Sequence, residues 1–261
     1  MKIAVSGKGG VGKTTFSSLL IRTFNDMGKQ VLAIDADPDA NLAAAVGIAD
    51  ADRITPISEM KELIYERTEA QPGSIGGFFK LNPKVDDLPD ALSARFENIK
   101  LMRLGGIKKG GSGCICPEST LLKVLMTHIV LARDEVVVMD MEAGIEHLGR
   151  GTAKAVDKLL VVVEPGRRSI ETAGHIRKLA GEIGLHHIAL VGNKVRNDTD
   201  EAFLKTHLSD FEFLGVIPYD DTLIEADLSG KSPYDADSPS KDIIRKMIEH
   251  IDTHAQPPQG S

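Results

Sequence analysis

Residues 2–15 read KIAVSGKGGVGKTT, and this stretch decides the fold. The run from Lys2 to Ser6 is apolar and partly β-branched, which is typical of a buried strand. Gly7 to Thr14 then fits the phosphate-binding pattern G-x-x-x-x-G-K-[ST]. In such a loop, backbone N–H groups point at phosphate oxygens from the start of a helix. The stretch therefore predicts a P-loop between a strand and a helix.

The loop also assigns tasks to its side chains. Lys13 should reach the β- and γ-phosphates of a nucleotide, and the hydroxyl of Thr14 should ligate Mg²⁺. Several positions must lack a Cβ, because phosphate oxygens crowd the backbone. The residues expected to bind the nucleotide here are Gly9, Gly10, Val11, Gly12, Lys13, Thr14 and Thr15.

The flanks of the motif support this interpretation. Residues 13–27 carry apolar side chains at helical spacing, and Gly28 follows where a C-terminal cap glycine belongs. The bland alternative is a glycine-rich turn in an unrelated α/β protein. A strand before the motif and a helix after it favour the P-loop.

Length and composition bound the remaining possibilities. The 261 residues suit one α/β domain over 1–255, with 256–261 as a flexible tail. A net charge of −7 argues against non-specific nucleic-acid binding. The sequence shows no secretion signal and no apolar run long enough to cross a membrane. Two cysteines imply no disulfide framework, so we expect a cytoplasmic protein. From the charge and the lack of a long apolar run, we expect no nucleic-acid or membrane partner.

Strand-like and helix-like segments alternate along the chain. This alternation predicts an α/β fold, a doubly wound and mostly parallel sheet flanked by helices. Helices are expected at 117–131, 168–184 and 238–254. Residues 53–90 read as helical insertions and loops on the nucleotide face. The expected further strands are 30–36, 98–104, 133–140, 157–164, 187–192 and 211–217.

Carboxylates follow two of these strands. Asp35 and Asp37 lie at the end of the second strand, and Asp140 ends the central strand at 133–140. The carboxyl ends of parallel strands meet at one edge of the sheet, beside the phosphate site. Asp140 should hydrogen-bond a water molecule on Mg²⁺.

Both cysteines lie in one glycine-rich stretch, as Cys114-x-Cys116. Thiolates are soft ligands that suit Ni²⁺, Zn²⁺ or Cu⁺. One chain supplies only two of the four sulfurs that a closed tetrahedral site needs. A two-fold dimer would supply all four. The stretch therefore predicts a metal site shared between two copies, and the alternative is a pair of free thiols.

The sequence GKGGVGKTT resembles the deviant P-loop of the family that contains MinD, ParA and the nitrogenase iron protein. The resemblance implies that Lys8 crosses a dimer interface to the partner's phosphates, and that Lys8, Lys13 and Asp37 are the catalytic residues. It places Asp35 near the water shell of Mg²⁺ and makes Asp37 orient or deprotonate the attacking water. It further implies that these residues contact the γ-phosphate or the adenine: Gly144, Asn193, Pro218 and Asp220.

A narrower resemblance covers essentially the whole chain. The segments DMEAGIEHLGRG, VVVEPGRRSIETA, GNK and IPYD, with the C-x-C pair, are similar to CooC-type ATPases. Those are maturation factors for nickel-containing carbon monoxide dehydrogenase and acetyl-CoA synthase. The resemblance implies an ATP-hydrolysing homodimer that holds Ni²⁺ or Zn²⁺ across its two-fold axis and serves such an enzyme. Glu142 stands where related chains often have proline.

Two other functions stay open. A MinD- or ParA-type positioning ATPase would lack a metal role, and the mixed charge of the last helix counts against it. An electron-transfer ATPase like the nitrogenase iron protein needs one cysteine from each of two distant loops, which a C-x-C pair does not supply. His147 follows the expected second switch, although most histidines of this kind are packing or surface residues.

Overall fold

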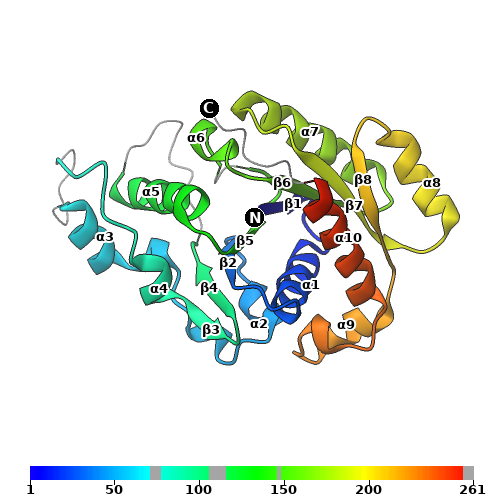
Figure 1. Cartoon of the computed structure of the whole chain (residues 1–261), viewed down its shortest axis with the longest axis horizontal. Coiled ribbons are helices and arrows are strands. Elements are labelled where there is room, and N and C mark those ends of the chain that lie inside the picture. Colours follow the sequence, from blue (N-terminus) through cyan, green and yellow to red (C-terminus); the bar gives the residue numbers. More distant parts are fainter. Residues whose placement is uncertain (71–77, 106–115, 146–147, 255–261) are drawn as a thin grey trace.

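The computed structural model describes residues 1–70, 78–105, 116–145 and 148–254. These residues form an eight-stranded sheet in the order β3-β4-β2-β5-β1-β6-β7-β8. The pairs between neighbouring strands are parallel except for β3 and β4, which pair antiparallel at one edge. The expected tail, 256–261, lies outside the described residues. The predicted doubly wound, mostly parallel sheet is confirmed (Figure 1).

The strands are short and mostly buried. Because both faces of a parallel sheet are covered by helices, its central strands read as continuous apolar runs. The strands are β1 (Lys2–Gly7), β2 (Val31–Ala36), β3 (Ala94–Phe96), β4 (Ile99–Arg103), β5 (Val136–Met141), β6 (Lys158–Val163), β7 (Ile188–Val195) and β8 (Glu212–Pro218).

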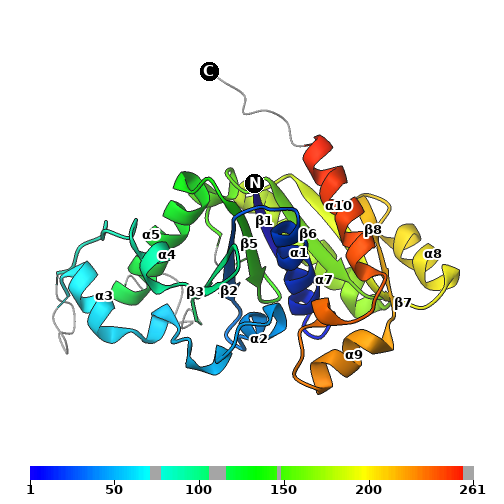
Figure 2. The same ribbon diagram turned by 60° about the horizontal axis from the view of Figure 1, so that its bottom comes forward.

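The helices lie in two layers on opposite faces of the sheet (Figures 1 and 2). One layer contains α5, α6, α7 and α8, and the other contains α1, α2 and α10. The helices are α1 (Lys13–Asp26), α2 (Leu42–Val46), α3 (Lys61–Thr68), α4 (Leu88–Leu92), α5 (Pro117–Ala132), α6 (Arg150–Ala153), α7 (Arg167–Ile183), α8 (Asp198–His207), α9 (Asp221–Leu228) and α10 (Ser240–His254).

The expected helical insertion between β2 and β4 forms α3 and α4, with short 3₁₀ turns. Its buried side chains Ile57, Ile64 and Leu88 join the core layer that contains α5. The N–H of Ser58 donates to the carbonyl of Leu104, just after β4. The described part of the insertion thus covers the sheet edge, and none of its residues lines the nucleotide pocket described below.

Two features of the sheet were not predicted. The three-residue strand β3 turns back on β4 as an antiparallel edge, and it is too short to show a periodic pattern. Strand β7 continues beyond Gly192 to Val195, so Asn193 and Lys194 belong to the end of this strand. Both features change the boundaries of the sheet and leave its order intact.

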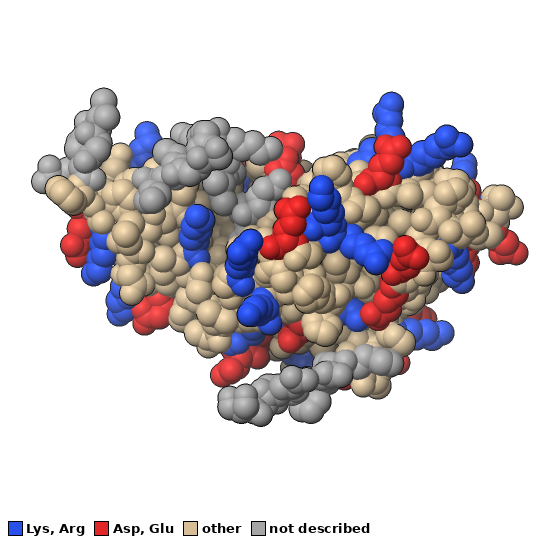
Figure 3. Space-filling view, turned by 90° about the horizontal axis from the view of Figure 1, so that it is seen from above, with Lys and Arg blue, Asp and Glu red and all other residues tan. Residues whose placement is uncertain are grey.

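The outer surface carries charges of both signs. On the face seen in Figure 3, described Lys and Arg side chains lie between described Asp and Glu side chains. Interspersed charge of this kind differs from the continuous basic stripe of a nucleic-acid face. None of the described helices is long and apolar enough to span a bilayer.

Candidate nucleotide-binding site

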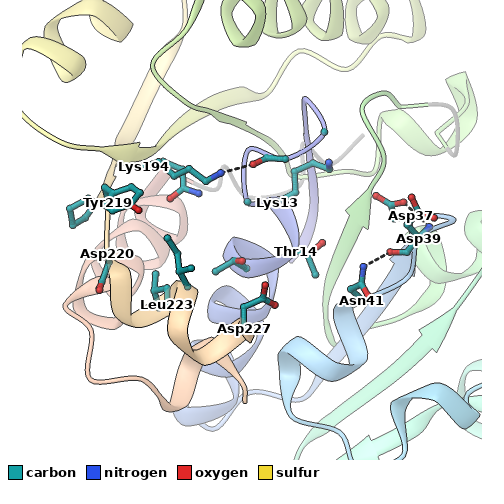
Figure 4. Close-up of a pocket in the computed structure, with 17 residues that line it drawn as sticks. Lys13, Thr14, Asp37, Asp39, Asn41, Lys194, Tyr219, Asp220, Leu223 and Asp227 are labelled. Atoms are coloured by element: carbon teal, nitrogen blue, oxygen red, sulfur yellow. Dashed lines mark hydrogen bonds between the residues drawn. The ribbon is translucent and has the colours of Figure 1, made fainter. Parts of the chain in front are cut away.

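The P-loop joins β1 to α1 as predicted. Lys13 is the first residue of α1, and Gly12 caps the helix in the left-handed region with φ of 91°. The Lys13 side chain is only 7% exposed and borders a pocket of about 440 Å³ (Figure 4). The residues that line this pocket are Gly9, Gly10, Gly12, Lys13, Thr14, Thr15, Asp37, Asp39, Asn41, Asn193, Lys194, Pro218, Tyr219, Asp220, Leu223, Ile224 and Asp227.

The end of β7 holds the P-loop in shape. The Nδ2 of Asn193 donates to the carbonyl oxygen of Val11 at 2.7 Å, and the Nζ of Lys194 donates to that of Gly10 at 2.6 Å. A Cβ on Gly12 would lie 2.4 Å from Asn193 Nδ2. Gly12 is therefore required by a protein contact as well as by its positive φ. Asn193 also lines the pocket. Its predicted reading of adenine stays a prediction.

Two carboxylates lie below the loop on neighbouring strands. Asp35 on β2 is in register with Asp140 on β5, and both are essentially inaccessible. Burial, reinforced by the charge of Asp140, raises the pKa of Asp35 to about 7. Burial also raises the pKa of Asp140 to about 6, against the opposing effect of the Thr14 and Ser17 hydroxyls and of Lys13. The nearby cations therefore do not fully compensate the burial of these two carboxylates, and both pKa values are raised.

The chemistry of this pair fits Mg²⁺. The Ser17 hydroxyl donates to Asp140 Oδ1 at 3.0 Å. The other oxygen, Oδ2, is buried and has no hydrogen-bond partner among the described residues. A buried carboxylate oxygen normally has a partner. A water molecule on a cation beside Thr14 would supply one, so Asp140, Asp35 and Thr14 are the residues that would hold Mg²⁺.

The predicted first switch lies on the opposite wall from β7. Asp35 accepts from the N–H of Leu42 at 3.0 Å and of Asp37 at 3.3 Å, which ties the loop to the start of α2. The side chain of Asp37 lines the pocket and accepts from the N–H of Asp39 at 3.0 Å. Asp37 thus faces the pocket, and its predicted role toward an attacking water stays a prediction.

The far end of the pocket has an apolar wall that the sequence did not indicate. Pro218 and Asp220 line the pocket as predicted. The Asp220 carboxylate accepts from the N–H of Thr222 at 2.9 Å and from the hydroxyl of Ser238 at 2.6 Å, so it also caps α9. The unpredicted lining residues are Tyr219, Leu223, Ile224 and Asp227, with Lys194 from β7. Leu223, Ile224 and Asp227 follow an i, i+1, i+4 spacing, which is typical of one face of a helix and could have indicated α9.

Five residues predicted for the nucleotide site lie outside the lining, and two of them are the buried carboxylates Asp35 and Asp140 described above. The side chain of Val11 is buried in the core, and only its backbone faces the loop. The N–H of Gly144 donates to the carbonyl of Glu142 at 2.7 Å, so a contact with γ-phosphate requires this turn to rearrange. Lys8 forms an ion pair with Glu164 on its own subunit.

The predicted thiol pair is described only in part. Cys116 caps α5, and its sulfur accepts from the N–H of Ser119 at 3.5 Å. Cys114 and His147 lie outside the described residues. Among the described residues, no three His, Cys, Asp or Glu side chains form a group that could hold a metal ion. The predicted shared metal site therefore stays a prediction.

Known proteins of similar sequence and structure cover the whole chain. Residues 2–234 match the model of the CobQ/CobB/MinD/ParA nucleotide binding domain. The carbon monoxide dehydrogenase accessory protein CooC of Rhodospirillum rubrum is 45% identical over 263 residues, which is 100% of this chain and 99% of that protein. An uncharacterized ATP-binding protein of Methanocaldococcus jannaschii is also 45% identical, over 96% of this chain and 97% of its own.

Among solved structures, MinD in the MinC:MinD cell division protein complex of Aquifex aeolicus superposes with a TM-score of 0.68 at 18% identity. The alignment covers 99% of this chain and 98% of that one, and at this identity it shows the fold alone. The P-loop geometry, the family match and the full-length relatives agree. The chain therefore belongs to the CobQ/CobB/MinD/ParA family of nucleotide-binding proteins, and within it to the ATPases related to the carbon monoxide dehydrogenase accessory protein CooC.

Proposed function

We propose that this ATPase is an accessory protein for a nickel-containing carbon monoxide dehydrogenase or acetyl-CoA synthase. The observation that carries the proposal is the 45% identity to CooC over both full lengths. The ATPase uses ATP binding and hydrolysis to help place nickel in the cluster of that target. The nickel is cargo, held between two copies of the chain.

The pocket supports the ATP half of the proposal. Lys13 and the loop N–H groups bind the phosphates, and Asp37 orients the attacking water. When bound, Mg²⁺ neutralises charge that develops on the phosphates. The base lies between Asn193 and the apolar side chains of α9. Lys8 reaches the phosphates of the partner, so turnover depends on dimerisation.

The cysteines support the metal half. Cys116 lies at the first turn of a long, packed helix, which fixes its position in each subunit. Two copies of Cys114 and Cys116 give four sulfurs, the number that a tetrahedral site needs. ATP and metal both favour the closed dimer, and hydrolysis loosens it, so that metal affinity falls when the nucleotide is spent.

Native mass spectrometry tests the proposal. Wild type, Cys114→Ser and Cys116→Ser are mixed with Ni²⁺ or Zn²⁺, with and without a non-hydrolysable ATP analogue. We expect one metal per wild-type dimer and none in either variant. A Lys13→Ala protein is the control that should lose nucleotide and keep its thiols. Nucleotide-driven dimers without cysteine-dependent metal would instead favour a positioning ATPase.

A further inference from the structure

One carboxylate lies between two lysines at the P-loop. Glu164 Oε1 is 3.7 Å from Lys8 Nζ, and Glu164 Oε2 is 3.6 Å from Lys194 Nζ. The two lysines come from different parts of the chain, Lys8 from the P-loop and Lys194 from the end of β7. Glu164 therefore joins the ends of three neighbouring strands, β1, β6 and β7, at the nucleotide edge of the sheet.

The position of Glu164 is fixed by its backbone. It is the first residue after β6, and its N–H donates to the hydroxyl of Ser169 at 3.0 Å. Ser169 itself is 2% exposed on α7. Pro165 follows and restricts the backbone of Glu164 further. The carboxylate is thus held at one place beside the loop, although 27% of the side chain remains exposed.

Lys194 is also held in place. Its φ of 56° lies in the left-handed region, which a residue with a side chain adopts only when its surroundings compensate. Its ammonium donates to the carbonyl of Gly10 and pairs with Glu164. Lys194 is therefore tied into its own subunit twice. For Lys8, the Glu164 carboxylate is the ion-pair partner among the described residues.

We propose that Glu164 is a positioning residue for ATP hydrolysis, which holds Lys8 on its own subunit until Lys8 exchanges this carboxylate for the phosphates of the partner's nucleotide. The inference rests on the proposed dimeric ATPase. An ion pair whose side chains are 35% and 27% exposed is weak enough to break and strong enough to bias an equilibrium by a few fold. Charge-assisted bonds to phosphate in a closed interface are stronger, so the exchange runs toward the dimer when ATP is bound.

The first test reads the pair without nucleotide. Lysines of the nucleotide-free protein are acylated briefly, and each site is quantified by mass spectrometry. In Glu164→Gln, which keeps the shape and removes the charge, we expect labelling of Lys8 to rise about two- to fivefold relative to exposed Lys246. Glu171→Gln, an exposed glutamate on α7, is the matched control. Glu164→Asp keeps the charge and should restore protection in part. Unchanged Lys8 labelling in Glu164→Gln would overturn the proposal.

The second test reads the consequence for turnover. ATPase rate is measured against protein concentration at saturating ATP. Glu164→Gln should reach half-maximal specific activity at about two- to fivefold lower protein concentration than the control Glu171→Gln. A midpoint that stays or moves to higher concentration contradicts the proposal. If the specific activity of no variant depends on protein concentration, the proposal of a dimeric ATPase is wrong. The labelling experiment tests the Lys8–Glu164 ion pair separately, because it uses no nucleotide.

Discussion

At the scale of single residues, the side-by-side burial of the Asp35 and Asp140 carboxylates is unfavourable, and a bound cation would relieve it. Their strands are adjacent and their side chains are in register, so each carboxylate is buried beside the other. The packing of the sheet against its two helix layers offsets this cost. The same arrangement leaves Asp140 Oδ2 ready to accept from a water molecule on a cation.

This arrangement makes the stability of the metal-free protein depend on pH. Burial raises the pKa of Asp140 to about 6 in the folded chain, above that of an unfolded aspartate. A raised carboxyl pKa contributes stability that is present at low pH and is lost as pH rises through the folded value. In EDTA, the stability of Asp140→Asn minus that of wild type should therefore grow by roughly 1–3 kcal/mol from pH 4 to pH 8.

Urea unfolding at each pH measures this difference, because the effects of groups that do not interact with Asp140 cancel between the two proteins. The pKa of Asp35 falls when the charge of Asp140 is removed, which changes the difference in the same direction. Asp134→Asn, at an exposed turn next to the same strand, is the control and should show a flat difference. A difference for Asp140→Asn that shrinks as pH rises would show that the buried carboxylate is stabilised in its charged form.

Asp37 should act on turnover and spare binding. Asp37 lines the pocket on the wall opposite Lys194 (Figure 4). A residue that orients or deprotonates water contributes about 10²–10⁴-fold to rate. In Asp37→Asn we expect kcat to fall by at least about 10²-fold, with the dissociation constant of ATP changed little. Asp39→Asn, two residues on and also in the lining, should lose far less. Equal losses in both variants would assign the effect to the loop rather than to Asp37.

The motifs indicated which residues belong to the site, but they did not indicate the protein contacts that these residues make. The motif predicted glycine at position 12 because of phosphate, whereas the nearest obstacle to a Cβ there is Asn193 Nδ2. Asn193 was predicted to read adenine, and it also holds the P-loop through Val11. Such second roles depend on contacts between residues almost the whole chain apart, which no local pattern contains.

At the scale of elements, the last helix shows how packing decides between functions. Residues Ile244, Met247, Ile248 and Ile251 of α10 are buried against α1 and the sheet. The helix was predicted over 238–254, and it spans Ser240–His254. An apolar face that is already covered is not available to a membrane surface, so α10 serves the core.

Truncation on this face should destabilise the whole domain. Ile248 is fully buried, and replacing it with alanine removes apolar contacts and leaves a cavity. We expect Ile248→Ala to lower the free energy of unfolding by about 2–5 kcal/mol, measured by urea denaturation. Glu249→Ala, the exposed neighbour, should change it by less than about 0.5 kcal/mol. A negligible effect at Ile248 would mean that α10 is not docked in solution.

Other elements escaped prediction for identifiable reasons. Strand β3 has three residues, too few for periodicity, and it forms because β4 offers an edge. Helix α9 was not predicted, although it supplies the apolar wall of the pocket, because its eight residues follow a proline and carry mixed polarity. Long buried strands and helices were predicted within a few residues, because each carries its own pattern.

At the scale of the whole molecule, two features of one subunit are incomplete in the same way. Lys8, 35% exposed at the nucleotide edge of the sheet, contacts a carboxylate in place of the phosphates proposed for it, and the C-x-C pair supplies two sulfurs where four are needed. A second copy of the chain would complete both. The proposed dimer thus links nucleotide to metal, because both ligands would favour the same closed arrangement of subunits.

Linkage then requires the coupling to be reciprocal. If a non-hydrolysable ATP analogue raises the affinity for Zn²⁺ by some factor, Zn²⁺ must raise the affinity for the analogue by the same factor. We expect a factor of about 5–150, the usual range for coupled sites. Zn²⁺ affinity is measured by competition with a chromophoric chelator, and analogue affinity by calorimetry, each with and without the other ligand.

Cys114→Ser should abolish the coupling and leave the basal affinity for the analogue intact, because the pocket is built from the P-loop, the loop after β2, the ends of β7 and β8, and α9. Lys8→Ala should weaken the coupling from the nucleotide side, since the closed dimer loses the contact that joins it to ATP. Tight Zn²⁺ binding that ignores the analogue would contradict a metal site gated by ATP. In that case the thiol site would be independent of the ATPase. Lys8 and the C-x-C pair would then be completed by different partners.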